Sequence, residues 1–282
     1  MTAQTQALRA LVNGPEPFIA ADCYSALTAR IVEQAGFVAG YMGGHATGMM
    51  HYAVPDCGLL TTTEMIDQAG RVASSVSIPI IVDADQAGES VADVFRTIRR
   101  YEQVGVAGVH MEDEVNPKHS SFDGPLLPIA DMQARLAAAA EARTDPDFLI
   151  IARCDELYHE GGGGGGSVDE AVRRGVAYAE AGADVFLPTF AAPEDIARIA
   201  AEVACPIAGY GKLEPGLSLS LFTGWGTSAA AKAHQQWARH LREHGDLPPE
   251  AFGFEDKDAL IDQPLFDGIV RRWAERTGRP VR

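Results

Sequence analysis

Short apolar runs alternate along this chain with longer segments in which apolar residues recur with a helical period. A run that is apolar at nearly every position and rich in Val and Ile suits a strand buried on both faces, as in parallel sheets. The expected strands span residues 17–24, 38–43, 79–85, 108–112, 148–153, 184–189, 205–209 and 217–223. The amphipathic segments predict helices over residues 25–34, 63–75, 90–103, 130–142, 168–181, 192–203 and 228–243.

Cap residues support several of these helices. Thr62 and Ser167 stand where two of the helices would begin, and Gly36, Gly105 and Gly182 follow the ends of three others. Repeated strand–helix units of this kind predict an α/β fold, a closed (β/α)8 TIM barrel, with an open doubly wound sheet as the alternative.

The last part of the predicted barrel is irregular. The segment between the strands at 205–209 and 217–223 is too short for a helix of ordinary length, so the seventh crossover is expected to be shortened. Beyond about residue 244 the chain leads into a last amphipathic segment over residues 260–276. We expect a single barrel domain over residues 1–282, with a C-terminal helical extension that closes its own barrel or that of a neighbouring subunit.

The composition argues against several classes of protein. With 282 residues, of which 46% are hydrophobic and 22% charged, the chain can bury the core of one large α/β domain. A formal net charge of -16 without a Lys/Arg cluster argues against nucleic-acid and membrane partners. No apolar stretch approaches the roughly 20 residues that span a bilayer, and the N-terminus lacks a signal-peptide pattern, so we expect a cytoplasmic protein. The scattered cysteines are typical of reduced thiols.

Acidic residues close two consecutive apolar runs. Asp83 and Asp85 follow the run at 80–82, and Glu112 follows the run at 108–111. Carboxylates are depleted in strands and costly to bury, so acids that close neighbouring runs predict a shared cation at one end of a parallel sheet. Oxygen ligands favour Mg²⁺, with Mn²⁺ as an alternative, and which of the three acids touches the ion directly is left open. The competing interpretation is that these acids cap helices or pair with arginine.

The order of several motifs resembles a known superfamily. Asp83-Ala84-Asp85, the run from Gly105 to Asp113, Asn116-Pro117-Lys118, Ile150-Ile151-Ala152-Arg153 and Ala181-Gly182-Ala183-Asp184 together resemble the isocitrate lyase/phosphoenolpyruvate mutase superfamily, from about residue 17 to residue 205. The resemblance implies a Mg²⁺-dependent barrel that makes or breaks C–C or C–P bonds beside a 2-oxo or 2-hydroxy carboxylate. It also implies a homo-oligomer, a dimer of dimers in which neighbouring subunits exchange the last barrel helix.

The resemblance also assigns contacts to a small-molecule carboxylate substrate. Arg153 matches an arginine that binds anionic oxygens, and a structural ion pair with Glu112 is the alternative. Asp56 matches an acid that contacts metal-bound water or substrate, and an Asx turn is its alternative. Tyr24 matches an aromatic residue that packs on the substrate, with core packing nearly as well supported. The main-chain N–H groups of a carboxylate-binding turn complete the set, at Gly43, Gly44, His45 and Ala46.

The chain departs from the superfamily at the positions that select the reaction. The loop after the fourth strand reads Lys118-His119-Ser120-Ser121 and lacks the cysteine of the lyase sequence Lys-Arg-Cys-Gly-His, while its serines resemble the hydroxyl residues of phosphonate enzymes. Thr189 stands where lyases have Glu and phosphonate enzymes have His. We predict a Mg²⁺-dependent C–C lyase that acts on a small 2-oxo or 2-hydroxy carboxylate through an enolate, with these loop residues supplying protons or water. A C–P bond enzyme and a non-catalytic ligand-binding relative are the alternatives.

Overall fold

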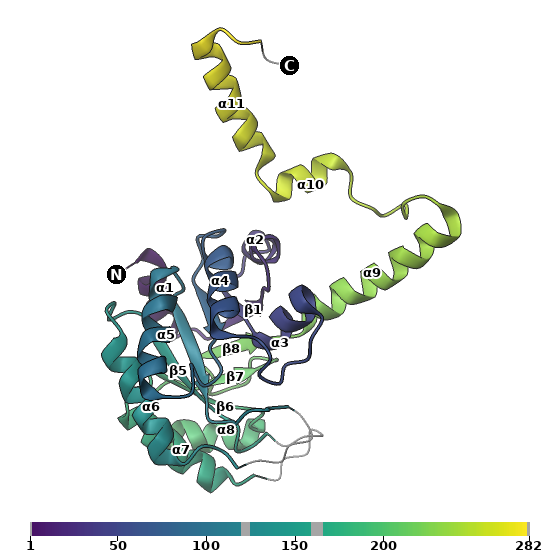
Figure 1. The fold of residues 1–282 in the computed structure, drawn as a ribbon. Coiled ribbons are helices and arrows are strands. Elements are labelled where there is room, and N and C mark those ends of the chain that lie inside the picture. The colour runs from purple at the N-terminus through teal and green to yellow at the C-terminus, as the bar shows by residue number, and fades with distance from the viewer. Residues whose placement is uncertain (1, 120–124, 159–165, 281–282) are drawn as a thin grey trace. The chain divides into compact units, whose positions relative to one another are not determined.

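The computed structural model describes residues 2–119, 125–158 and 166–280. Within them, eight parallel strands form one sheet (Figure 1). Each strand overlaps its predicted run. The strands are β1 (Phe18–Asp22), β2 (Ala39–Met42), β3 (Ile80–Asp83), β4 (Gly108–Glu112), β5 (Leu149–Cys154), β6 (Val185–Pro188), β7 (Ala208–Tyr210) and β8 (Leu219–Phe222).

The sheet closes on itself as a barrel. β1 pairs in parallel with both β2 and β8, so the first and last strands adjoin. β6 meets β7 through a parallel bridge between Phe186 and Ile207 and a 3.0 Å hydrogen bond from the Phe186 N–H to the Pro206 carbonyl. The predicted (β/α)8 TIM barrel is therefore confirmed, and its least regular seam lies between β6 and β7.

Helices follow the strands, and those before residue 228 pack against the sheet. Ser25 and Ser167 cap their helices by accepting a hydrogen bond from a first-turn N–H. Thr61, one residue before the predicted cap Thr62, does the same for its helix. The described residues 211–218, between β7 and β8, contain no helix, which confirms the shortened seventh crossover. The helices that match the predicted ones are α2 (Ala26–Gln34), α4 (Thr62–Ala73), α5 (Val91–Gln103), α6 (Ile129–Ala142), α7 (Val168–Glu180), α8 (Pro193–Glu202) and α9 (Trp225–His244).

Alternate residues of the strands fill the barrel interior. The interior cluster includes Ala20 of β1, Ile81 of β3, Ile151 of β5, Leu187 of β6 and Leu221 of β8. The intervening strand residues pack outward against the helices in a second, larger cluster. Because strand side chains alternate, the residue two positions after each of these five points toward the same interior, at the C-terminal mouth of the barrel. Those five residues are all polar and all border one cavity: Asp22, Asp83, Arg153, Thr189 and Thr223.

The sequence analysis did not predict the helix α1 (Ala3–Val12), the short helix α3 (Gly44–Thr47) or the π-helical turn η1 (Gly48–Tyr52). Leu8 and Val12 of α1 join the interior cluster. Arg9 of α1 pairs with Asp184, the residue before β6, at 2.7 Å. Helix α1 thus covers the N-terminal end of the barrel and leaves the C-terminal ends of the strands for a site.

The chain divides into two compact units, residues 1–227 and 228–282. The first unit contains the barrel. The second contains most of α9, together with α10 (Phe254–Leu260) and α11 (Gln263–Thr277). Helix α11 covers most of the amphipathic segment expected over residues 260–276, and Ile261 and Asp262 separate it from α10. The backbone of Asp262 is left-handed, with φ 55°, which a continuing helix does not allow. The single-domain assignment, with an extension from about residue 244, stays a prediction.

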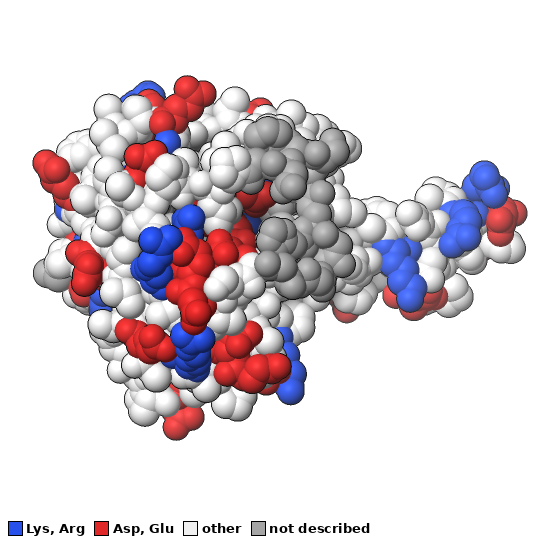
Figure 2. All heavy atoms as spheres, turned by 90° about the horizontal axis from the view of Figure 1, so that it is seen from below, with Lys and Arg blue, Asp and Glu red and all other residues white. Residues whose placement is uncertain are grey.

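Surface charges of both signs are interspersed on the face of the molecule shown in Figure 2. Exposed ion pairs include Arg198 with Glu202 at 3.1 Å, and such pairs contribute at most about 1 kcal/mol. Within the described part of the chain, no helix has both the length and the apolar character needed to cross a membrane.

Candidate active site and metal centre

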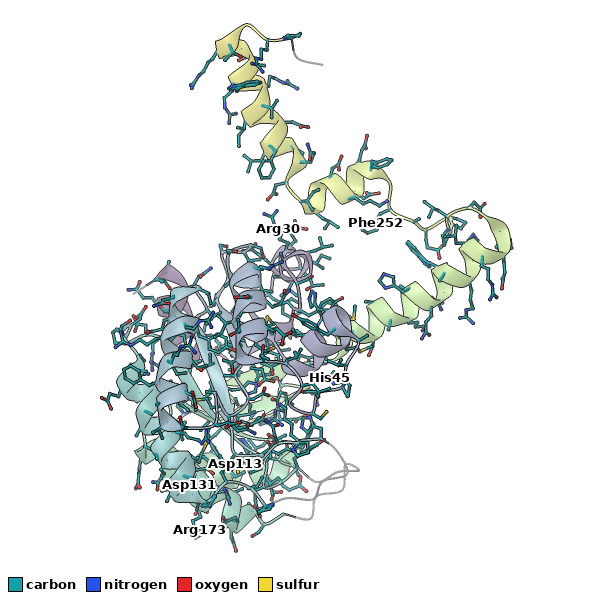
Figure 3. The ribbon with its side chains drawn as sticks, viewed as in Figure 1. Arg30, His45, Asp113, Asp131, Arg173 and Phe252 are labelled. Carbon is teal, nitrogen blue, oxygen red and sulfur yellow. The ribbon has the colours of Figure 1, made fainter. Side chains whose placement is uncertain are left out.

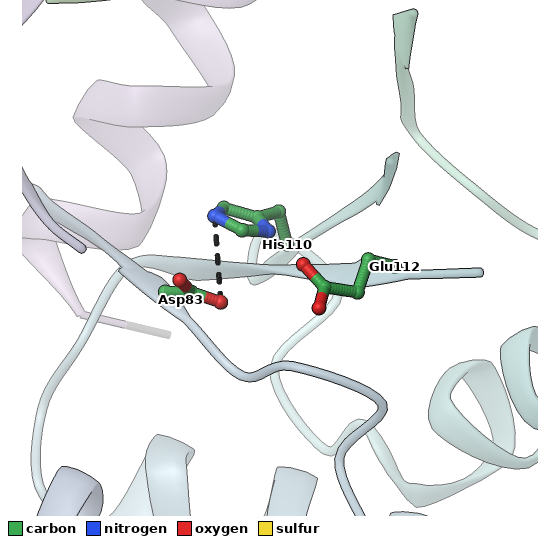
Figure 4. A group of neighbouring side chains, drawn as sticks. All are labelled: Asp83, His110 and Glu112. Carbon is green, nitrogen blue, oxygen red and sulfur yellow. Dashed lines mark ion pairs between the residues drawn. The ribbon is translucent and has the colours of Figure 1, made fainter. Parts of the chain in front are cut away.

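Three potential metal ligands lie together at the C-terminal ends of β3 and β4. Asp83 is the last residue of β3, Glu112 is the last residue of β4, and His110 lies two residues before Glu112. Strand pairing places Asp83 beside His110, and the His110 Nε2 lies 3.6 Å from the Asp83 Oδ1 (Figure 4). One ligand atom from each of the three side chains lies within 4.8 Å of the other two. These residues form a buried donor set.

A buried lysine joins the acids. The side chain of Lys118 is 0% exposed, and its Nζ lies 3.0 Å from the Glu112 Oε1 and 3.6 Å from the Asp56 Oδ1. The same ammonium group contacts the Asp85 Oδ1. On the other side of Glu112, the Arg153 Nη1 lies 2.8 Å from the Oε2. Because a buried charge is costly unless it is paired, ionised Glu112 depends on both cations.

The carboxylates of the cluster still outnumber its cations. With every group counted as ionised, the four acids Asp56, Asp83, Asp85 and Glu112 exceed Lys118 and Arg153 by two charges, and Asp155, which also pairs with Arg153, adds a further acid. Burial and the charge of Asp83 raise the pKa of Asp85 to about 7, and burial likewise raises the pKa of Asp56. A divalent cation would cancel the excess charge, and carboxylate oxygens are the ligands that Mg²⁺ prefers. The residues present therefore fit a Mg²⁺ site.

His110 is a site residue that the sequence analysis missed. Its ring stacks on Tyr41 with centroids 5.6 Å apart, and its Nε2 lies 2.7 Å from the Tyr41 Oη. Burial lowers the pKa of His110 and favours the neutral ring. Since Mg²⁺ prefers oxygen ligands, His110 fits better as a neighbour that positions Asp83 than as a ligand. The signal in the sequence was a polar residue at an interior position of a buried strand.

A cavity of about 240 Å³ opens beside this cluster and collects most of the predicted substrate contacts. Tyr24 is not part of its described lining; the Tyr24 ring instead meets His51 edge-on, with centroids 6.3 Å apart. Ser120 and Ser121 lie outside the described residues. The roles assigned to all these residues stay predictions. The predicted residues that line the cavity are Gly43, Gly44, His45, Ala46, Asp56, Asp83, His119, Arg153 and Thr189.

The turn after β2 brings main chain against the acids. The Gly44 N–H donates to the Asp83 Oδ2 at 3.0 Å. A Cβ at Gly44 would lie 3.0 Å from that oxygen and 3.3 Å from the Asp56 Oδ1, so any larger residue would crowd both carboxylates. His45 follows on the exposed side of α3 (Figure 3). The Gly44 N–H is thus engaged by Asp83, and the carboxylate-binding role of this turn stays a prediction.

Arg153 is held between acids and an aromatic wall. Its Nε lies 2.9 Å from the Asp155 Oδ1, and its guanidinium carbon lies 5.9 Å from the centre of the Tyr210 ring. The Phe190 ring follows at 5.8 Å from Tyr210, and the Tyr158 ring at 5.3 Å from Phe190. All three aromatic residues and Arg153 line the cavity. The sequence analysis gave an ion pair with Glu112 as the alternative role of Arg153. This ion pair is present, and the guanidinium group also borders the cavity.

Asp113, labelled in Figure 3, directly follows the site residue Glu112 in the chain. Its fully buried carboxylate accepts hydrogen bonds from the Arg174 Nη1 at 3.0 Å, the Tyr178 Oη at 2.7 Å and the Asp155 N–H at 2.9 Å. These bonds tie α7 and the end of β5 to the residue after Glu112. Asp113 thus fixes the direction of Glu112, and both of its oxygens are engaged by protein donors.

Comparisons with known proteins agree with this geometry. The family model described as phosphoenolpyruvate phosphomutase matches residues 8–240. The chain belongs to this family. The family lies within the isocitrate lyase/phosphoenolpyruvate mutase superfamily, so the resemblance carried by the motifs is confirmed. The chain is 36% identical over 195 residues to 2,3-dimethylmalate lyase from Eubacterium barkeri, a match that covers 68% of this chain and 65% of the lyase, slightly less than two thirds of its length.

Solved structures of family members share the whole fold. Phosphoenolpyruvate phosphomutase from Streptomyces platensis subsp. rosaceus has a TM-score of 0.86 and 27% identity, with 96% of this chain and 99% of that chain covered. Phosphonopyruvate hydrolase in complex with oxalate and Mg²⁺ has a TM-score of 0.82 and 27% identity, with 98% of this chain and 99% of that chain covered.

Proposed function

We propose that this protein is a Mg²⁺-dependent lyase that cleaves or forms a C–C bond in a small 2-oxo or 2-hydroxy carboxylate through an enolate. One observation carries the proposal: a buried cluster with an excess of carboxylates adjoins a cavity at the C-terminal mouth of the barrel. In TIM barrels this end holds the catalytic residues. The 36% sequence identity to 2,3-dimethylmalate lyase over 195 residues supports cleavage or formation of a C–C bond.

Asp83, Asp85 and Glu112 would hold Mg²⁺, directly or through water. Bound there, the ion supplies positive charge that stabilises the oxygens of an enolate. The main chain at Gly43 and Gly44, with the following residues His45 and Ala46, would bind a substrate carboxylate, as predicted.

Arg153 would bind a second anionic group, since its guanidinium group borders the cavity and keeps its charge. His119 would donate protons. Its Nε2 lies 3.2 Å from the Glu114 Oε2, and this carboxylate raises the pKa of His119 although burial opposes the rise. A protonated imidazole on the cavity wall is a suitable general acid. Lys118, together with Ser120 and Ser121, which follow His119 in the sequence, completes the predicted catalytic set.

A C–P bond enzyme is the second candidate. It is supported by the structural likeness to phosphonopyruvate hydrolase, which extends over 98% of this chain. Both candidates need the same acids and the same arginine, so the geometry of the described residues does not separate them.

Mass spectrometry with a substrate panel tests both candidates. The purified protein would be incubated with 2-hydroxy and 2-oxo dicarboxylates and with phosphonopyruvate, each with Mg²⁺ and with chelator. Chelator-sensitive cleavage of a dicarboxylate supports the lyase, and turnover of phosphonopyruvate alone supports the C–P enzyme. Asp85→Asn should be inactive, whereas Glu89→Gln, an exposed acid in the same loop, should keep full activity. A protein that binds neither Mg²⁺ nor oxalate in calorimetry would contradict both.

We also propose that the protein is a homo-oligomer, a dimer of dimers. The apolar residues on α11 are exposed within one chain, and a second copy would cover them in an exchange of C-terminal helices. Their positions recur with a helical period along one stripe: Leu265, Phe266, Ile269, Val270 and Trp273.

A further inference from the structure

Asp22 is a buried acid that none of the roles above uses. It is the last residue of β1 and lies two positions after Ala20, so its side chain points toward the barrel interior at the C-terminal mouth. Asp22 is 1% exposed and lines the cavity. Ala21 pairs with Phe222, the last residue of β8, so the residue level with Asp22 on that side is Thr223, which also lines the cavity. Asp22 thus stands on the same rim as Asp83 and Arg153.

The Asp22 carboxylate has no partner that would explain its burial. Neither oxygen is in hydrogen-bonding geometry with a donor among the described residues, and no ion pair with a described residue involves it. Burial raises the pKa of Asp22 to about 6, and the main-chain N–H of Gly224 opposes this rise only in part. At neutral pH the carboxylate is therefore mostly ionised, by roughly ten to one, and remains basic enough to accept a proton.

The other carboxylates of the cavity wall are already engaged. Asp83 accepts the N–H groups of Gly44 and Asp85, both at 3.0 Å. Asp56 lies 3.6 Å from the Lys118 Nζ. Among the described lining residues, Asp22 is thus the acid whose oxygens lack both an ion pair and a hydrogen bond.

The neighbours of Asp22 do not offer a better base. On its own strand, burial and the charge of Asp22 raise the pKa of the Cys23 thiol and of the Tyr24 hydroxyl, so both groups stay protonated. Tyr41, its register partner on β2, is fully buried, and burial raises the pKa of its hydroxyl as well. On the β8 side, the neighbouring residues Thr223 and Gly224 carry no charge.

We propose that Asp22 is the general base that takes the proton of a substrate hydroxyl group, and that the substrate is therefore a 2-hydroxy carboxylate. A buried, unpaired carboxylate beside a cavity is stabilised when a ligand brings a hydrogen-bond donor to it, and a hydroxyl group is such a donor. This inference rests on the proposed lyase function and selects between its two substrate classes.

In the proposed step, proton transfer to Asp22 accompanies cleavage of the C–C bond. Asp22 accepts the hydroxyl proton, the O–H electron pair becomes the second bond of a C=O group, and the adjacent C–C bond breaks. The fragment that carried the hydroxyl group leaves as a 2-oxo acid. The C–C electron pair goes to the other fragment, which holds it as an enolate of its own carboxylate and receives a proton at carbon from His119, so the substrate carries a second carboxylate next to the bond that breaks. Asp22 ends protonated and His119 neutral, and proton exchange with water restores both. In the reverse direction Asp22 returns its proton to the new hydroxyl oxygen.

The test compares Asp22→Asn and Asp22→Glu with the wild-type protein and with Glu16→Gln, an exposed acid just before β1. With the 2-hydroxy acid that the substrate panel identifies, Asp22→Asn should lower kcat by about 100-fold or more, the usual effect of losing a general base, and Asp22→Glu should restore part of it. Wild-type kcat should fall as the pH drops below about 6, because the base is then protonated, and the residual activity of Asp22→Asn should lack this limb. Glu16→Gln should match the wild type. The dissociation constant for oxalate with Mg²⁺ should be the same in all of these proteins.

Each other outcome decides the question as well. A kcat of Asp22→Asn within about threefold of the wild-type value overturns the inference. The inference is also overturned if the wild-type enzyme turns over only substrates without a hydroxyl group; the proposed Mg²⁺-dependent chemistry would still stand in that case. A wild-type protein that binds neither Mg²⁺ nor oxalate would instead overturn the proposed function.

If no panel member is turned over, calorimetry with malate and succinate tests the role of Asp22. The wild-type protein should prefer malate, the ligand with the hydroxyl group, and this preference should be about tenfold smaller in Asp22→Ala. An unchanged preference refutes the role.

Discussion

Replacing Lys118 with methionine removes a buried cation from the middle of the acid cluster. The Lys118 side chain is 0% exposed, and its ammonium group contacts Asp85, Glu112 and Asp56. Methionine has a similar length and fills the same space, so the main change is electrostatic. Breaking a buried ion pair by removing one partner costs about 3–5 kcal/mol, because the other charge is left uncompensated. We expect the free energy of unfolding of metal-free Lys118→Met to fall by about that amount.

Mg²⁺ should rescue this variant more than it stabilises the wild-type protein. The substitution raises the excess negative charge of the cluster by one, which strengthens the attraction for a divalent cation. Mg²⁺ at 100 times its dissociation constant adds about 2.7 kcal/mol to the stability of any protein that binds it only when folded. The tighter binding expected of Lys118→Met should make the gain in this variant larger at the same Mg²⁺ concentration.

The assay is urea unfolding followed by circular dichroism, with chelator and with Mg²⁺. Lys212→Met is the matched control, because the Lys212 side chain is 84% exposed and its ion pair with Glu214, at 3.4 Å, is a surface pair worth at most about 1 kcal/mol. The reasoning is refuted if metal-free Lys118→Met is within about 1 kcal/mol of the control, or if Mg²⁺ stabilises both variants equally.

Three further predictions concern the metal, the pH and the assembly. Asp85→Asn should abolish Mg²⁺ binding in calorimetry while leaving the circular dichroism spectrum unchanged; a wild-type Mg²⁺ affinity in this variant would remove Asp85 from the metal site. Because the folded-state pKa of Asp85 is raised to about 7, its contribution to stability is present below pH 4 and lost as the pH rises toward 7, so the Tm of metal-free wild type minus that of Asp85→Asn should decrease between pH 5 and pH 7.5. A flat difference would contradict the raised pKa. Phe266→Asp on α11 should lower the molar mass measured by light scattering after gel filtration, while Glu275→Gln, an exposed charge on the same helix, should not; an unchanged mass for Phe266→Asp would place the interface elsewhere.

The sequence by itself determined the strands and the main acids of the site. A parallel strand buried on both faces reads as a continuous apolar run, and a carboxylate at the end of such a run is conspicuous because burial is costly to it. Asp83 and Glu112 were recognisable for this reason, and the structure places them on adjoining strands as expected. Arg153 was recognisable through its place in a motif that ends a strand.

Other features depended on contacts between segments far apart in the chain. The ion pairs of Lys118 are one such feature, because only the folded chain brings Asp56, Asp85 and Glu112 around its ammonium group. Helix α1 was missed because its apolar side chains find their partners inside a barrel built from later residues.

Asp22 shows the division most clearly. Its position after Phe18 and Ala20 gave the same signal as Asp83 after Ile81, but a single acid in an alanine-rich run does not reveal whether it has a partner. Closure of the barrel decided that: it set β1 between β2 and β8 and turned Asp22 toward the cavity that Asp83 and Arg153 also line. Local sequence determines which face of a strand a side chain occupies, whereas the charges and donors that surround it come from other strands, and only the tertiary structure brings those together.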